Sequence, residues 1–136
     1  MKVKLDPGAR LPQRAHLADA GYDLYAKERN TVPAHGSAEF DTGVHIELPA
    51  NVAGLIVSKS GLNINHGLTS EGLIDPGFTG SIRVKLYNNT DTDYCVRKGD
   101  KISQLLLVPF LTPDLEIVEE LDDTERGSAG YGSTGR

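Results

Sequence analysis

The chain is short of residue types on which several classes of protein depend. It has one cysteine, Cys95, among 136 residues, so no disulfide can form within the chain. Positive charge is also scarce, because 14 Lys and Arg stand against 19 Asp and Glu, for a net charge of −5. A surface that binds a nucleic acid backbone needs many clustered Lys and Arg, so we expect no nucleic acid partner. A small anion held by a few converging groups is compatible with this charge.

Long apolar runs are missing as well. No stretch approaches the roughly 20 residues that a membrane-spanning helix needs, so we expect no membrane partner. The first ten residues, MKVKLDPGAR, lack the apolar run of a secretory signal, and together with the single cysteine this predicts a cytoplasmic protein. A hydrophobic content of 38% and a charged content of 24% are typical of one soluble globular domain.

Apolar residues recur with the two-residue period of strands. Residues 38–49 and 81–88 alternate apolar and polar side chains, which predicts two half-buried strands. Residues 52–58 and 101–110 are denser apolar runs, which predict strands covered on both faces, and one helical turn is expected at 61–68. The 15 glycines and 7 prolines punctuate the chain at intervals typical of a small barrel or sandwich. The predicted fold class is therefore all-β.

The composition changes near Asp122, which divides the chain into a body, residues 1–121, and a linker with a C-terminal arm, residues 122–136. The closing segment RGSAGYGSTGR, residues 126–136, consists mostly of glycine and small polar residues that cannot build a core, so we expect it to be flexible. Such an end is most often a frayed terminus. Its arginine fork, tyrosine ring and glycine-rich backbone are also the parts of a lid over a nucleotide.

Two internal segments indicate the same kind of ligand. SKSGLN, residues 58–63, follows an apolar strand with a cation, two hydroxyls and a glycine, which can meet a phosphate but are also ordinary turn residues. EGLIDPGFTG, residues 71–80, places Asp75 at the end of another strand. Asp-Pro-Gly usually opens a turn, yet an aspartate with an ordinary pKa is ionised at pH 7 and can accept a proton from water.

Five segments in order resemble the five motifs of the homotrimeric deoxyuridine triphosphatases. They are AGYDL (20–24), SKSGL (58–62), GLIDPGFTG (72–80), KGDKISQL (98–105) and RGSAGYGSTG (126–135), and they span nearly the whole chain. The resemblance implies a distorted jelly-roll β-barrel with a flexible C-terminal arm, and a homotrimer whose sites are shared between subunits. It further implies Mg²⁺-assisted hydrolysis of dUTP to dUMP and pyrophosphate, which limits uracil incorporation into DNA and supplies dUMP for dTMP synthesis.

The resemblance also implies a role for each matching position. Asp75 matches the carboxylate that activates the water attacking the α-phosphorus, and Asp23 matches the aspartate that reaches Mg²⁺ through its waters. Phe78 matches a ring against the deoxyribose that excludes a 2′-hydroxyl. Arg126 matches the γ-phosphate grip, and Tyr131 matches the ring stacked on uracil. The other implied substrate-binding residues belong to the triphosphate grip, the base pocket and the arm: Lys59, Ser60, Gly61 and Gln104; Thr69, Gly72, Leu73 and Ile74; Gly132, Ser133 and Thr134.

Three places depart from the family pattern. Ser58 and Lys59 stand where the family commonly has Pro-Arg, so the planar fork of arginine is absent. Phe78 stands in place of the commoner Tyr, and Tyr131 in place of the commoner Phe. The last two changes keep an aromatic ring, so we expect modest effects from them.

Two other functions compete with the triphosphatase. The related dCTP deaminases share the fold and the phosphate motifs, but their catalytic glutamate aligns with Lys85, which cannot act as that carboxyl group. A non-catalytic nucleotide-binding scaffold on the same fold is an alternative of another class. The presence of Asp75, Asp23 and the whole terminal motif favours the enzyme, because a scaffold has no need of them.

Overall fold

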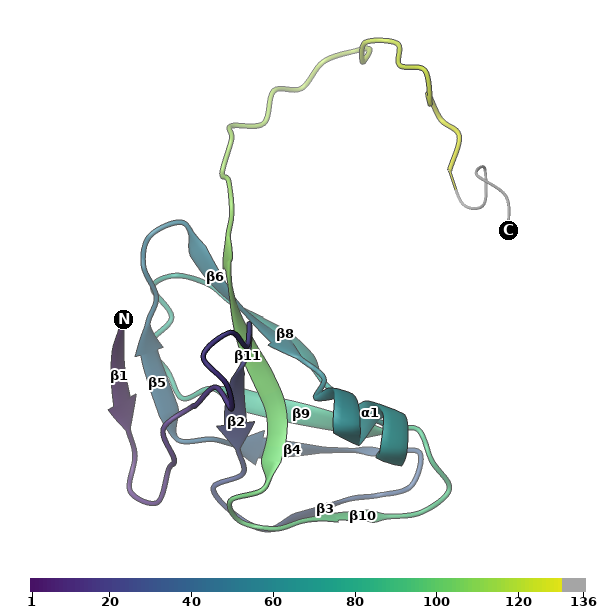
Figure 1. Ribbon diagram of the computed structural model, residues 1–136. Helices are drawn as coiled ribbons and strands as arrows, with labels where there is room; N and C mark the ends of the chain where they lie inside the picture. Colours follow the sequence, from purple (N-terminus) through teal and green to yellow (C-terminus); the bar gives the residue numbers. More distant parts are fainter. Residues whose placement is uncertain (131–136) are drawn as a thin grey trace.

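The computed structural model describes residues 1–130, and its regular structure is almost entirely β (Figure 1). This confirms the all-β prediction for the body, and the expected helical turn is the single helix of the described residues. The elements are β1 (Lys2–Leu5), β2 (Tyr22–Tyr25), β3 (Asn30–Val32), β4 (Ser37–Asp41), β5 (Val44–Glu47), β6 (Val52–Val57), α1 (Ser60–His66), β7 (Leu68–Thr69), β8 (Glu71–Ile74), β9 (Arg83–Asn88), β10 (Tyr94–Val96) and β11 (Lys101–Pro109).

Four antiparallel sheets enclose one core. The largest has the strand order β2-β11-β6-β8, and a second has the order β4-β9-β7. Two pairs, β1-β5 and β10-β3, complete the body. Side chains from the two larger sheets meet between them, where Leu24, Leu86 and Leu105 are at most 1% exposed. Burial of these aliphatic side chains is the main source of stability for a body of this size.

Three of the four predicted strands are confirmed, with ends that shift by one or two residues. In β9, buried and exposed residues alternate strictly, so that Val84 and Leu86 enter the core. β6 and β11 also form where expected, with Ile56 and Leu105 facing the core. Their second face differs from the prediction. It is only half-buried at Leu55 and Val57 of β6 and through most of β11.

The prediction of one strand over residues 38–49 is wrong. The segment divides into β4 and β5, which pair with β9 and β1 in different sheets. Gly43 makes the break with a φ of 65°, a left-handed conformation that residues with a side chain rarely adopt. Thr42 stabilises the bend, because its hydroxyl donates to the Ile82 carbonyl at 2.7 Å and accepts from the Val44 N–H at 3.2 Å.

The chain leaves the body after β11. Figure 1 shows the segment beyond Pro109 running away from the sheets as one extended stretch. Four apolar side chains of this stretch are between 86% and 99% exposed: Leu111, Leu115, Ile117 and Leu121. No helix within residues 1–130 has the length and apolar character needed to cross a membrane.

Candidate active site

Three of the predicted site residues meet where β2, β11 and β6 lie side by side. The register pairs Asp23 with Gln104, and Gln104 with the last residue of β6. Lys59 follows β6 by two residues, and its Nζ lies 3.1 Å from Asp23 Oδ1. Gln104 Nε2 donates to the same oxygen at 3.3 Å. We call Asp23, Lys59 and Gln104 the acidic-pair cluster, because Lys59 and Gln104 each pair with the one acidic group, the Asp23 carboxylate.

Asp23 is the electrostatic centre of this cluster. Its side chain is only 3% exposed, and Lys101 Nζ contacts its second oxygen at 2.7 Å. Burial by itself raises the pKa of Asp23, but hydrogen bonds and charge from Lys101 and Lys59 outweigh burial and lower that pKa below its ordinary value. Asp23 is therefore a carboxylate at neutral pH, compensated by two ammonium groups.

Gly21 allows β11 to approach the start of β2. A Cβ at this position would lie 3.1 Å from the Gln104 Cβ and 3.2 Å from a Leu106 methyl group. A larger residue here would make Gln104 or Leu106 shift by a few tenths of an ångström, so the glycine favours the close approach of β11 to β2.

The turn after β6 presents the next two predicted residues to solvent. Ser60 and Gly61 open α1, and both are exposed. A Cβ built on Gly61 would have no atom within 4 Å, so the surface above this turn is open. The turn therefore offers a hydroxyl and free space in the two residues that follow Lys59.

A second group of predicted residues lines a cavity at the far end of β8. The cavity measures about 290 Å³, and Asp75 and Phe78 are both exposed beside it. The Phe78 N–H donates to the Asp75 carbonyl at 3.2 Å, which closes the Asp-Pro-Gly turn. The predicted site residues that line this hairpin cavity are Gly72, Leu73, Ile74, Asp75 and Phe78.

The two groups lie at opposite ends of β6 within one chain. Antiparallel pairing sets Ile74 opposite Gly54, which places Asp75 beside Ala53. Ser58 lies five residues further along the chain, and five residues of extended strand span about 16 Å. Thr69 lies at the Ser58 end, where it lines a separate groove of about 520 Å³. The structure thus brings Asp23, Lys59 and Gln104 together but keeps Asp75 apart from them.

The predicted arm residues divide at the limit of the described chain. Arg126 is exposed, and its Nε donates to the Ala129 carbonyl at 2.9 Å within the arm itself. Tyr131, Gly132, Ser133 and Thr134 lie outside the described residues.

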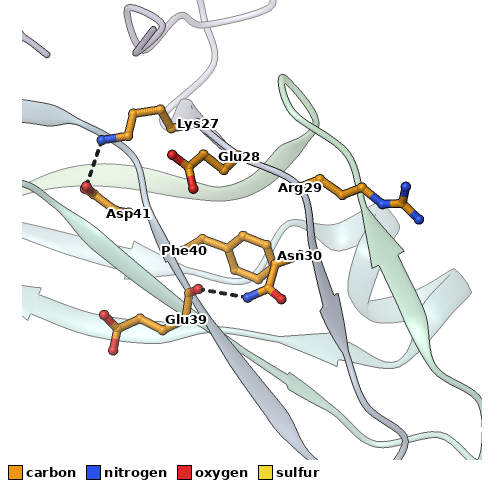
Figure 2. Close-up of a pocket in the computed structure, with 7 residues that line it drawn as sticks. All are labelled: Lys27, Glu28, Arg29, Asn30, Glu39, Phe40 and Asp41. Carbon is orange, nitrogen blue, oxygen red and sulfur yellow. Dashed lines mark hydrogen bonds and ion pairs between the residues drawn. The ribbon is translucent and has the colours of Figure 1, made fainter. Parts of the chain in front are cut away.

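A further cavity, of about 140 Å³, lies away from every predicted site residue (Figure 2). Figure 2 shows Lys27 reaching across to Asp41 of β4, at 2.9 Å, while Arg29 extends away from the others. The Ser81 hydroxyl and the Lys27 ammonium hold the pKa of Asp41 well below its usual range. The ionised Asp41 therefore fixes Lys27 and Ser81 beside the bend between β4 and β5, and we assign this cavity a structural role.

Lys101 is a residue of the site that motif matching leaves without a role. It belongs to the KGDKISQL segment, but its partner Asp23 is 78 positions earlier in the chain. The β11 register shifts between Lys101 and Ser103, and such an irregularity redirects a side chain. No local signal in the sequence predicts this contact.

Comparison with known proteins supports the resemblance to the deoxyuridine triphosphatases. The dUTPase family model matches residues 8–135. The deoxyuridine 5′-triphosphate nucleotidohydrolase of Candida albicans is 39% identical over 140 residues, covering all of this chain and 88% of that protein. The protein of that name from Paramecium bursaria Chlorella virus 1 is 42% identical, covering 97% of this chain and 94% of that protein.

Solved structures agree in fold. A mutant dUTPase of Staphylococcus bacteriophage 80alpha, solved with dUpNHpp, has a TM-score of 0.93 at 31% identity and covers 99% of this chain and 98% of that chain. A mutant dUTPase of phage phi11 of S. aureus, described as showing coordination of a structural Mg(II) ion, has a TM-score of 0.82 at 31% identity, over 88% of this chain and 96% of that chain. This likeness confirms the predicted jelly-roll fold. From the family match across residues 8–135 and the full-length relatives, the chain belongs to the dUTPase family.

Proposed function

We propose that this protein hydrolyses dUTP to dUMP and pyrophosphate. The observation that carries the proposal is family membership along the whole chain, together with an exposed aspartate, Asp75, beside a cavity large enough for part of a nucleotide. In the cell this reaction would limit uracil incorporation into DNA and supply dUMP for dTMP synthesis. We also propose that the protein acts in the cytoplasm and binds neither nucleic acid nor a membrane.

In the proposed reaction, Asp75 accepts a proton from a water molecule as that water attacks the α-phosphorus. A bond forms between the water oxygen and the α-phosphorus, and the bond from the α-phosphorus to the bridging oxygen of the β-phosphate breaks. Pyrophosphate leaves as one unit with the bonding electron pair. Asp75 is suited to this because it is exposed at a turn, where a water molecule can approach it.

The hairpin cavity is proposed to select the base and the sugar. Backbone groups of Gly72, Leu73 and Ile74, with Thr69, would bind the edge of uracil. Phe78, which is 49% exposed beside this cavity, would pack against the deoxyribose. A ribose 2′-hydroxyl placed against this ring would lose its hydrogen bonds to water without gaining a partner, which disfavours UTP.

The triphosphate is proposed to bind at the other group of residues. Lys59 supplies a charge, Ser60 a hydroxyl, Gly61 an open backbone and Gln104 an amide. Asp23 is the single carboxylate here, and within residues 1–130 no three metal-ligating side chains converge. One buried, ionised carboxylate fits a Mg²⁺ ion that is held mainly by phosphate oxygens and reaches the protein through water. Such an ion would neutralise charge on the phosphates as pyrophosphate departs.

A site shared between copies of the chain is part of the proposal. A single chain keeps Asp75 about 16 Å of strand away from the Ser58 end of β6, which is too far for a water on Asp75 to attack a phosphorus held there. A second copy can supply the missing half. The uncovered face of the large sheet supports this. Leu55 lies between Leu106 and Leu73 on this face, and Leu73 is 63% exposed, so a second copy packed there would cover apolar side chains. We therefore propose that three copies of the chain form the homotrimer that the resemblance to the family implies.

The arm is proposed to complete the site. Residues 122–136 would follow the extended stretch after β11 and close over the site, with Arg126 on the γ-phosphate and Tyr131 stacked on uracil. Gly132, Ser133 and Thr134 would wrap the phosphates, so that closure excludes water other than the nucleophile. The exposed apolar side chains between Leu111 and Leu121 support an arm that lies on another copy, since a monomer would leave them in water.

The proposal is tested by measuring pyrophosphate release from dUTP, dCTP, dTTP and UTP, with Mg²⁺ and then with EDTA. We expect release from dUTP alone, dependent on Mg²⁺, with dUMP as the product found by chromatography. Uracil nucleotides formed from dCTP would show instead that the protein acts as a dCTP deaminase. The absence of turnover with all four substrates would favour a nucleotide-binding scaffold.

A further inference from the structure

Three serines lie next to the acidic-pair cluster and are linked to one another by hydrogen bonds, through hydroxyls between Ser70 and Ser103 and through the Ser70 backbone to Ser58. Ser58 follows β6, Ser70 lies between β7 and β8, and Ser103 belongs to β11. The Ser70 and Ser103 hydroxyl oxygens are 2.8 Å apart, and Ser103 Oγ donates to the Val57 carbonyl at 2.7 Å. Ser58 Oγ accepts from the Ser70 N–H at 2.9 Å and donates to the Ser70 carbonyl at 3.1 Å. Ser70 is 5% exposed and Ser103 is fully buried.

The direction of every bond among these serines follows from the number of protons. A serine hydroxyl has one proton to donate. Because Ser103 gives its proton to the Val57 carbonyl, Ser70 must be the donor between Ser70 and Ser103. Ser58 likewise uses its proton on the Ser70 carbonyl. All three hydroxyls are thus satisfied in one arrangement only, which fixes their rotamers.

Ser70 is the residue at which the backbone changes sheets. β7 before it pairs with β9, and β8 after it pairs with β6. The Ser58 hydroxyl accepts from the N–H of Ser70 and donates to its carbonyl, and it thus replaces a neighbouring strand as the partner of this peptide backbone. A buried peptide group without hydrogen-bond partners would cost stability, and Ser58 supplies those partners. The same two bonds join the turn after β6 to the point where the backbone passes from β7 to β8.

Each end of this set of linked serines stands next to a residue of the acidic-pair cluster. Ser58 immediately precedes Lys59, and Ser103 immediately precedes Gln104. Neighbouring residues of a strand point to opposite faces, so the inward bonds of Ser103 set the outward position of Gln104. The Ser58 bonds similarly set the path of the backbone that delivers Lys59 to Asp23.

We propose that Ser58, Ser70 and Ser103 are positioning residues that hold Lys59 and Gln104 in place to bind the triphosphate of the substrate. They touch no substrate themselves, and the proposal rests on the proposed function of dUTP hydrolysis. Ser58 stands where the family commonly has Pro. Its hydrogen-bonded hydroxyl would restrain the turn that a proline ring would otherwise stiffen. Loss of a link should loosen the phosphate grip more than the base pocket.

The test compares two ligands in variants of the full chain. Affinities for dUpNHpp and for dUMP are measured by calorimetry in wild type, Ser58→Ala, Ser58→Thr and Ser103→Ala. For Ser58→Ala and Ser103→Ala we expect dUpNHpp binding to weaken about fivefold to tenfold and dUMP binding less than about twofold, with kcat lowered about tenfold. Ser58→Thr keeps the hydroxyl and should restore most of the ratio between the two affinities.

Thr42→Val is the matched control. The Thr42 hydroxyl also donates to a buried carbonyl and accepts a backbone N–H, but it lies at the bend between β4 and β5. We expect this variant to lose stability without changing the ratio of affinities. An unchanged ratio in both alanine variants, or the same change in Thr42→Val, would overturn the proposal. A wild-type protein that fails to hydrolyse dUTP would instead overturn the proposed function, and this is seen before any variant is compared.

Discussion

Asp75→Asn is expected to reduce the turnover of dUTP by about 10²- to 10⁴-fold, the usual contribution of a general base. An asparagine has the shape of aspartate but cannot accept a proton from the attacking water. Asp75 is exposed, and the hydrogen bond that closes the Asp-Pro-Gly turn uses its backbone carbonyl rather than its side chain. The fold and the affinity for dUpNHpp should therefore remain close to those of wild type. Turnover is measured by pyrophosphate release, and affinity by calorimetry.

Asp91→Asn is a suitable control for the loss of one carboxylate. The Asp91 side chain is 95% exposed and contacts His35, away from both groups of site residues. Its turnover should equal that of wild type. An Asp75→Asn protein that keeps more than about half of wild-type turnover would remove Asp75 from the role of general base, whatever its affinity.

Deletion of residues 126–136 is expected to lower kcat/KM for dUTP by at least about 100-fold, because misaligned or unshielded phosphates react slowly. The melting temperature should change little, since every core residue of the described chain precedes Phe110. The deletion removes Arg126 and the proposed stacking and phosphate-wrapping residues, but none of the strands. Kinetics and thermal melting of the same preparation separate the two effects.

A shorter deletion of residues 135–136 is the matched control, because it removes none of the residues with a proposed role. We expect it to retain most of the activity. If the chain ending at residue 125 hydrolysed dUTP as fast as the full-length protein, the arm would have no part in catalysis and the frayed-terminus interpretation would replace the lid.

Local periodicity predicts which side chains are buried, but it does not predict which sheet buries them. The alternation of β9 predicts its strand correctly because all its inward residues enter one core. Across residues 38–49 every even-numbered residue from Phe40 to Leu48 is buried, although the strand breaks at Gly43. The pattern stays in phase through the break, so periodicity alone joins β4 and β5 into one strand.

The site is predictable residue by residue more readily than as an arrangement. Motifs single out Asp23 and Lys59 separately, but their contact joins positions 36 residues apart through the register of three strands. The serine hydroxyls are harder still, because Ser70 and Ser103 are 33 residues apart and serine is also a common turn residue. Only the folded arrangement distinguishes a serine that links two segments from one that ends a strand.

The separation of Asp75 from the acidic-pair cluster makes the shared site the central claim. It is tested most directly by mixing two inactive variants, Asp75→Asn and the double variant Lys59→Ala with Ser60→Ala. Equal amounts are unfolded and refolded together, and native mass spectrometry confirms that single assemblies contain both chains. In the proposed shared site, Asp75 comes from one copy and the Lys59 turn from another, so random mixing would leave about one site in four intact.

We therefore predict that the mixture recovers about a quarter of wild-type dUTP turnover, although each parent refolded alone stays inactive. Mixed assemblies with no more activity than their parents would contradict the account, because Asp75 and the Lys59 turn would then have to act within one copy.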